Sequence, residues 1–143
     1  MQRIAPEVVS IAGACLGGLQ GRSALLVGPE EQRAPFIQLL KHAKMKYIYE
    51  EDTSTRLPDL LPYVQLLISI PAFSLSEQQQ PAEPLVTAAS IAQGCSGRRT
   101  PLLIFDLAPK SSVEELAGLL PSVCLYTPND LRHILSNAEV KAS

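Results

Sequence analysis

The sequence predicts an α/β domain of three layers, Rossmann-like, with a mostly parallel sheet preceded by one N-terminal helix. Short continuous apolar runs, typical of strands buried on both faces, alternate with stretches of helical period. Residues 23–33, Ser-Ala-Leu-Leu-Val-Gly-Pro-Glu-Glu-Gln-Arg, combine a buried strand, a glycine turn and a helix start. A doubly wound nucleotide-binding fold begins in this order. Alternating strands and helices favour parallel pairing with right-handed crossovers.

The bulk properties indicate one domain and exclude several classes of protein. A length of 143 residues allows a hydrophobic core. We expect an N-terminal helical segment over residues 1–20 and the Rossmann-like unit over residues 21–143. The net charge of −2 argues against a general nucleic-acid surface. No apolar run approaches the ~18 residues needed to span a bilayer, and a basic signal-peptide start is lacking. We therefore expect a cytoplasmic protein with no membrane partner.

The first helix is expected over residues 6–19, where Pro6 suits the first turn and Glu7 complements the positive helix end. Its apolar face would contain residues at helical spacing, Cys15 among them. Because this helix precedes the first strand, we expect it to be an appendage to the wound core, able to join that core to another domain.

Five strands are expected to follow, with helices between them. The expected strands are residues 24–27, 47–49, 64–70, 102–105 and 123–126. The expected helices are residues 34–44, one turn within 57–61, 85–93, 112–120 and 131–138. Pro35 is expected either to lie in the first turn of its helix or to kink it. Residues 74–83 are predicted to form a loop.

The turn after the first strand is the first candidate site. Dinucleotide sites use Gly-x-Gly-x-x-Gly, with the phosphates at the following helix N-terminus. Here Gly28, Glu30 and Arg33 fill the three glycine positions, so only the tight turn is kept. Glu30 places a carboxylate where a diphosphate would approach. A carboxylate ~4 Å from a phosphate weakens the free energy of binding by on the order of 4 kcal/mol at an effective dielectric near 20. A plain structural turn is the alternative interpretation.

Two further candidates lie where expected strands end, the edge at which open α/β sheets bind ligands. Glu50 follows Gly28 by about twenty residues, the usual spacing of a ribose-binding acid. Together with Glu51 and Asp52 it would repel a 2′-phosphate and favour NAD over NADP; the alternative is a solvated charged loop. Asp106 is either a ligand group or a cap for the loop that follows it.

No catalytic residue and no metal site are expected. The cysteines, Cys15, Cys95 and Cys124, are far apart in sequence and form no Cys-x-x-Cys pair. Neither His42 nor His133 lies in a motif that would support a nucleophile, and both are expected on the surface. We expect all three cysteines to be reduced and inert.

Several segments together resemble the nucleotide-binding domain of glutamyl-tRNA reductase. Residues 21–28, Gly-Arg-Ser-Ala-Leu-Leu-Val-Gly, resemble the Gly-Lys-x-x-Leu-x-Ile-Gly opening of that family. Residues 64–72 resemble its Asp-x-Val-Ile-Ser-Ala-Thr strand, and residues 101–109 its Ile-Asp-x-Ala-x-Pro-Arg loop. Residues 120–126, Leu-Pro-Ser-Val-Cys-Leu-Tyr, resemble its Leu-Pro-Gly-Val-x-Leu-Tyr strand, and Asp130-Leu131 its Asp-Asp-Leu helix start. The order and spacing of these segments are more specific than any one of them.

The resemblance covers about residues 4–135 and implies a function. Glutamyl-tRNA reductase uses NADPH to reduce the glutamyl group of glutamyl-tRNA to glutamate-1-semialdehyde, in tetrapyrrole synthesis. It implies here an NADPH-binding oxidoreductase domain that meets glutamyl-tRNA only through another domain. In that family a separate C-terminal helical domain dimerises, so the resemblance allows a homodimer without assigning one to this segment. Cys15 lies outside the family's nucleophile motif, so the chain alone is expected to be inactive.

With the Ser-Ala-Thr loop aligned to Ser69-Ile70-Pro71, the candidate cofactor-binding residues number seven. They are Gly28, Pro29, Glu30, Glu31, Glu50, Ser69 and Asp106. The sequence departs from the family in its glycine turn, in lacking an Asn-Arg-Thr-like segment after the second strand, and in Lys110 within a shortened loop. Two alternatives therefore stay open: a Rossmann module that serves as an interaction or regulatory domain, and a dehydrogenase of sirohaem synthesis.

Overall fold

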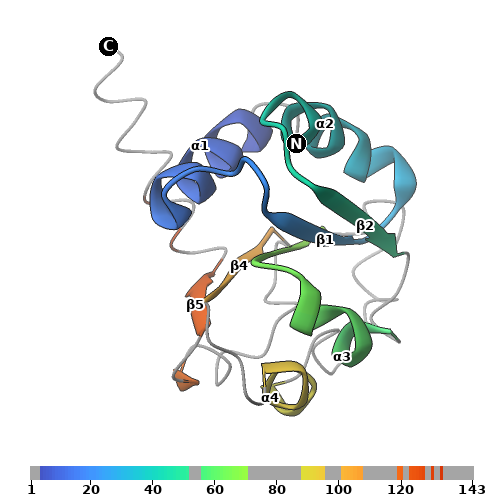
Figure 1. The fold of residues 1–143 in the computed structure, drawn as a ribbon, viewed down its shortest axis with the longest axis vertical. Coiled ribbons are helices and arrows are strands. Elements are labelled where there is room, and N and C mark those ends of the chain that lie inside the picture. The colour runs from blue at the N-terminus through green and yellow to red at the C-terminus, as the bar shows by residue number, and fades with distance from the viewer. Residues whose placement is uncertain are drawn as a thin grey trace.

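Five parallel strands form one sheet in the order β2-β1-β3-β4-β5, which confirms the predicted α/β class. In Figure 1 the strands lie between the pair α1 and α2 and the pair α3 and α4. The strands are β1 (Ser23–Val27), β2 (Tyr47–Glu51), β3 (Leu66–Ser69), β4 (Leu102–Asp106) and β5 (Val123–Tyr126). Every pairing between neighbours is parallel. Leu25 lies opposite both Tyr49 and Leu67, so β1 is the strand between β2 and β3.

The computed structural model describes residues 4–51, 56–70, 88–95, 101–107, 119–120, 123–127, 130 and 133. Within them the helices are α1 (Ile4–Leu16), α2 (Glu30–His42), α3 (Leu57–Leu60) and α4 (Ala88–Cys95), and the 3-10 turn η1 (Leu61–Tyr63) follows α3. The predicted loop at 74–83 and most of the predicted helices at 112–120 and 131–138 lie outside the described residues.

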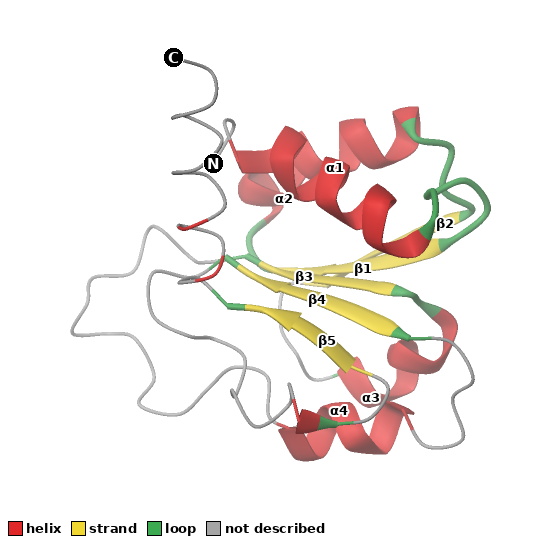
Figure 2. Cartoon of the chain, turned by 90° about the vertical axis from the view of Figure 1, so that its left-hand side faces the viewer, coloured by secondary structure: helices red, strands yellow, loops and turns green. Residues whose placement is uncertain are grey.

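Helices cover both faces of the sheet, α1 and α2 on one side and α3 and α4 on the other (Figure 2). Two buried apolar clusters result. The cluster under α1 and α2 contains Leu26 and Phe105, and the cluster on the α3 and α4 side contains Leu25 and Ile104. All residues of β1, β3 and β4 are buried. This burial on both faces accounts for the continuous apolar runs in the sequence.

α1 is part of the hydrophobic core, because Val8 and Ala12 belong to the cluster shared with the sheet. Its C-terminal end is held by Arg22, whose Nη2 donates to the Leu16 carbonyl at 2.6 Å and whose Nε donates to the Gly18 carbonyl at 3.0 Å. A cation at this end also complements the helix dipole. The structure confirms a helix in this segment, but α1 ends at Leu16, so the predicted end at residue 19 is wrong. The division at residue 20 stays a prediction.

α2 begins at Glu30, and Pro35 lies inside it. Of the two expectations for Pro35, a helix start at residue 34 with the proline in the first turn is therefore wrong. The proline lies inside the helix, as the other expectation requires, and a kink there stays a prediction. A proline inside a helix removes the hydrogen bond to the carbonyl four residues earlier. That carbonyl belongs to Glu31, so the interruption falls near the helix start, and α2 continues to His42.

A thiol–phenol contact joins α1 to the outer strand β5. Cys15 Sγ lies 3.3 Å from the Tyr126 hydroxyl, and the Tyr126 ring stacks on Phe105 with centroids 5.0 Å apart. Cys15 is exposed, so its predicted place on the apolar helix face is wrong. The hydrogen bond to Cys15, followed by burial and nearby charges, raises the pKa of Tyr126 to about 12. Burial, and then the charge of Cys15, raise the pKa of Cys124.

Two glycines in helices give a matched pair of stability predictions. A Cβ at Gly94 would lie 2.6 Å from Leu61 Cβ, whereas a Cβ at Gly13 would meet only Leu19 Cγ, at an ordinary 3.9 Å. We expect Gly94→Ala to lower the free energy of unfolding by about 1–3 kcal/mol through overpacking of α4 against η1. We expect Gly13→Ala to raise it by about 0.5–1 kcal/mol through helix propensity. Urea denaturation of both variants measures this, and shifts of the same sign would contradict the close approach at Gly94.

The Tyr126 contact predicts a late tyrosine titration. Because the folded chain favours the neutral phenol of Tyr126, this phenol contributes to the stability of the fold in full below pH 10. The contribution is lost as the pH rises toward 12. An alkaline ultraviolet titration should show one of the four tyrosines ionising near pH 12. Cys15→Ala should move that ionisation back toward 10, since the bond to Cys15 is the largest cause. An unchanged titration in Cys15→Ala would show that the contact does not form in solution.

Candidate functional site

The strand order places a topological switch between β1 and β3. From β1 the chain passes to β2 on one side, and it later returns to place β3 on the other side. Open α/β sheets bind ligands outside the carboxyl ends of the strands at such a point. The turn at Gly28 and the end of β3 flank this position, since Val27 lies opposite Ser69.

Gly28 makes the tight turn that the sequence predicts. Its φ is +146°, and a Cβ here would lie 2.6 Å from the Ile70 carbonyl oxygen and 2.8 Å from Ile70 Cβ. The backbone is held on both sides, because Gly28 N–H donates to the Glu51 carbonyl at 2.9 Å and Ile70 N–H donates to the Val27 carbonyl at 2.8 Å. Glycine is therefore required at this position by the packing of the protein itself. A role for Gly28 in cofactor binding stays a prediction.

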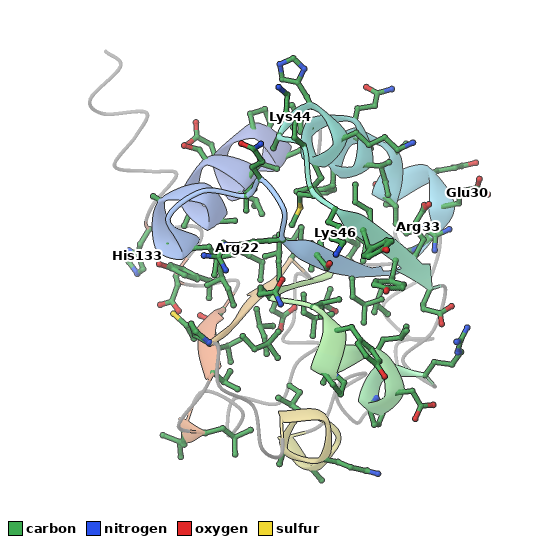
Figure 3. The ribbon with its side chains drawn as sticks, in the orientation of Figure 1. Arg22, Glu30, Arg33, Lys44, Lys46 and His133 are labelled. Carbon is green, nitrogen blue, oxygen red and sulfur yellow. The ribbon has the colours of Figure 1, made fainter. Side chains whose placement is uncertain are left out.

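The N-terminus of α2 follows this turn directly. Pro29 is the N-cap, with φ −62° and ψ 142°, and its carbonyl accepts the N–H of Gln32 at 3.0 Å and of Arg33 at 3.1 Å. Glu30 and Glu31 are exposed, and Figure 3 shows Glu30 projecting outward from the first turn. The positive helix end therefore lies next to the switch point, the location that suits a diphosphate.

Arg33, at the third glycine position of the motif, connects α2 to β2. Its side chain is only 8% exposed, and its Nε lies 3.5 Å from Glu50 Oε1. Glu50 is 44% exposed at the side chain and lies opposite Leu26 of β1. A long buried side chain thus fills the space where a glycine would let helix and strand touch. The motifs place Arg33 and Glu50 in separate candidate sites and do not predict this ion pair. The βαβ order could have indicated it, because this order brings the start of α2 near the end of β2.

Glu51 belongs to the opposite face of β2, because neighbouring residues in a strand point to opposite sides. Its Oε1 lies 3.4 Å from Arg56 Nη1, just ahead of α3. Both glutamates are within β2, so the prediction that the strand ends at residue 49 and that these acids lie in the exit loop is wrong. The reason is that ladder pairing to β1 continues through Val27 and Glu51. Asp52 lies outside the described residues.

Ser69 and Asp106 lie side by side at the ends of β3 and β4, in the same register as Val27. Their exposed fractions are 0% and 1%. The predicted site residues therefore form two groups. Ser69 and Asp106 accompany the glycine turn at the centre of the sheet, and Glu50 lies one strand outward, on β2. Lys110 and its loop lie outside the described residues.

Other kinds of site have little support in the described part of the chain. No group of three or more histidine, cysteine, aspartate or glutamate side chains there could hold a metal ion. Nor does any helix there have both the length and the apolar character that crossing a bilayer requires. His42 and His133 are exposed, as predicted. Burial raises the pKa of the Cys124 thiol, which makes it a poorer nucleophile, and the expected inertness of the cysteines stays a prediction.

Comparison with known proteins agrees with this geometry. No family model matches the sequence. Over 92% of its length the chain is 28% identical to glutamyl-tRNA reductase of Methanospirillum hungatei, and over 93% it is 27% identical to that of Idiomarina loihiensis. A 56-residue stretch is 41% identical to the Xanthomonas campestris reductase. The chain spans about a third of the length of the first two relatives, 35% and 34%.

Solved structures show the same fold. Glutamyl-tRNA reductase from Methanopyrus kandleri superposes with a TM-score of 0.75 at 22% identity, covering 94% of this chain and 37% of that chain. A dipicolinate synthase from Bacillus halodurans gives 0.63 at 14% identity, over 96% and 52% of the two chains. Trypanosoma brucei methylenetetrahydrofolate dehydrogenase-cyclohydrolase, solved with NADP, gives 0.54 at 14%, over 89% and 44%.

These matches extend over nearly all of this chain and reach only one part of each reductase. The similarity of this chain to the nucleotide-binding domain of glutamyl-tRNA reductase, predicted from the order of its motifs, is thereby confirmed.

Proposed function

We propose that this chain is the dinucleotide-binding domain of a glutamyl-tRNA reductase-type oxidoreductase, and that it binds a reduced nicotinamide dinucleotide. One observation supports this most strongly. This chain matches about one third of the length of the curated reductases, 35% of the first. In this chain the matched part forms a parallel sheet with a glycine turn at its switch point. NADPH is the form of the cofactor that the resemblance implies.

The residues at the carboxyl edge fit the parts of such a cofactor. The turn at Gly28 and the first turn of α2, at Glu30 and Glu31, would face the diphosphate. Glu50 would lie at the adenosine ribose, because it follows the turn at the usual spacing and is partly exposed. Ser69 and Asp106 flank the turn on its other side. When bound, the nicotinamide supplies a hydride, and the chain's part is to hold and orient it.

The activity of the complete reductase is proposed for a longer protein of which this chain provides one part. Reduction of glutamyl-tRNA needs a nucleophile and a tRNA-binding surface. Cys15 and Cys124 lie at the β5 side of the sheet, where their surroundings favour the protonated thiol of Cys124. We therefore expect this chain alone to bind cofactor without turning over substrate.

The alternative of an interaction module rests on the two replaced glycines. Glu30 projects to solvent (Figure 3), and Arg33 Nε lies 3.5 Å from Glu50 Oε1 on β2. A nucleotide at the turn would therefore meet the charge of Glu30, which weakens its binding, without displacing the Arg33 side chain. The similarity to the reductases favours the cofactor-binding function over this alternative.

Calorimetric titration with NADPH tests the proposal. We expect one binding site per chain, and about tenfold tighter binding by Glu30→Gln, because a carboxylate near the diphosphate is removed and exposure reduces the full Coulomb effect. Glu7→Gln is the matched control, since it neutralises a first-turn glutamate of α1. It should leave the dissociation constant unchanged. The absence of any heat from wild type and Glu30→Gln, with NADPH and with NADH at high micromolar concentration, would contradict the proposal.

A further inference from the structure

Within the proposed nucleotide site, on which this inference depends, we propose that Glu50 sets the choice between NADH and NADPH and that Arg33 positions it. The two side chains meet at the adenosine end of the site. The consequence is a preference for a ribose with a free 2′-hydroxyl group, which departs from the NADPH that the resemblance implies.

The position of Glu50 suits contact with a ribose. It lies near the end of β2, opposite Leu26, and β1 ends one residue later at the glycine turn. Its side chain points to the α2 side of the sheet, where Arg33 meets it. With 44% of the side chain exposed, the carboxylate is accessible to a ligand. An acid at this place in a dinucleotide fold accepts hydrogen bonds from the ribose hydroxyls.

Arg33 holds this carboxylate in place. Its side chain is 8% exposed and its Nε is 3.5 Å from Glu50 Oε1. Burying a guanidinium is costly unless an opposite charge lies close to it. The pair therefore restricts Glu50, which without this partner would lose more conformational entropy on meeting a ligand. Arg33 is a positioning residue, because it acts on the ribose through Glu50.

The same pair disfavours the 2′-phosphate of NADPH. A phosphate at this place would lie beside the Glu50 carboxylate, and like charges repel. Sites that accept the 2′-phosphate use an arginine at this end of the fold. Here the arginine already has a carboxylate within ion-pair distance. Neutralising Glu50 would therefore remove the repulsion and turn Arg33 into a partner for the phosphate.

Glu51 provides an internal control. It is adjacent to Glu50 in β2, carries the same charge and is also ion-paired, to Arg56 at 3.4 Å. Its side chain points to the opposite face of the sheet, toward α3, and away from α2. Neutralising Glu51 thus changes the net charge equally without changing the group that faces the proposed ribose position.

The experiment measures the dissociation constants of NADH and NADPH for wild type, Glu50→Gln and Glu51→Gln by calorimetry. We expect wild type to bind NADH more tightly than NADPH. Glu50→Gln should shift the NADPH-to-NADH ratio of dissociation constants at least tenfold toward NADPH. Glu51→Gln should leave that ratio within about twofold of wild type.

Arg33 is tested by combination with Glu50→Gln. Arg33→Met in the Glu50→Gln background should abolish the gain in NADPH affinity, whereas Arg33→Lys, which keeps the cation, should retain part of it. A thermal melt confirms that each variant is folded. If the methionine variant does not fold, the NADPH affinity of the lysine variant shows whether the gain depends on Arg33.

The outcomes separate the two proposals. A chain that binds both cofactors with the same ratio in wild type and Glu50→Gln overturns the role of Glu50 and leaves the proposed function intact. A wild-type chain that binds NADPH more tightly than NADH also overturns the role of Glu50. A chain that binds neither cofactor, in any variant, overturns the proposed function and this inference together.

Discussion

Burial of the three central strands on both faces is the constraint on which the rest of the structure depends. β1, β3 and β4 are buried throughout, so helices have to cover each side of the sheet. Because both faces are covered, polar groups that serve a ligand are left to the edges where the strands end. The glycine turn, Ser69 and Asp106 all lie at this carboxyl edge, and contact of these residues with a ligand stays a prediction.

Most of the fold could be predicted because it follows from local patterns. Continuous apolar runs identify strands that are buried on both faces, and their alternation with helical segments specifies a parallel sheet. The sequence leaves two alternatives open for the start of α2, because a proline indicates a helix boundary in most sequences. Here only one backbone bond near the helix start is lost, and Arg33 and Phe36 are buried to either side of the proline. Tertiary packing outweighs the local preference.

The candidate site was predictable in its backbone and not in its side-chain pairs. Spacing alone located Gly28 and Glu50. The ion pair between Arg33 and Glu50 depends on how α2 is rotated above β2, and the contact of Cys15 with Tyr126 depends on how α1 lies over β5. Neither rotation is encoded in a short motif, because both result from packing across the whole face. Spacing therefore predicts Glu50 as a ribose-binding acid or as part of a solvated loop, and only the packing of α2 adds Arg33 as its partner.

The close approach of Gly28 to Ile70 has an evolutionary consequence. Any side chain at position 28 would push apart two central strands, whatever the turn binds. A descendant that lost its cofactor would still have to keep this glycine, while positions 30 and 33 would be free to drift. Retention of Gly28 therefore indicates descent within this fold and not nucleotide binding. The charges at positions 30 and 33 say more about whether the turn binds a nucleotide.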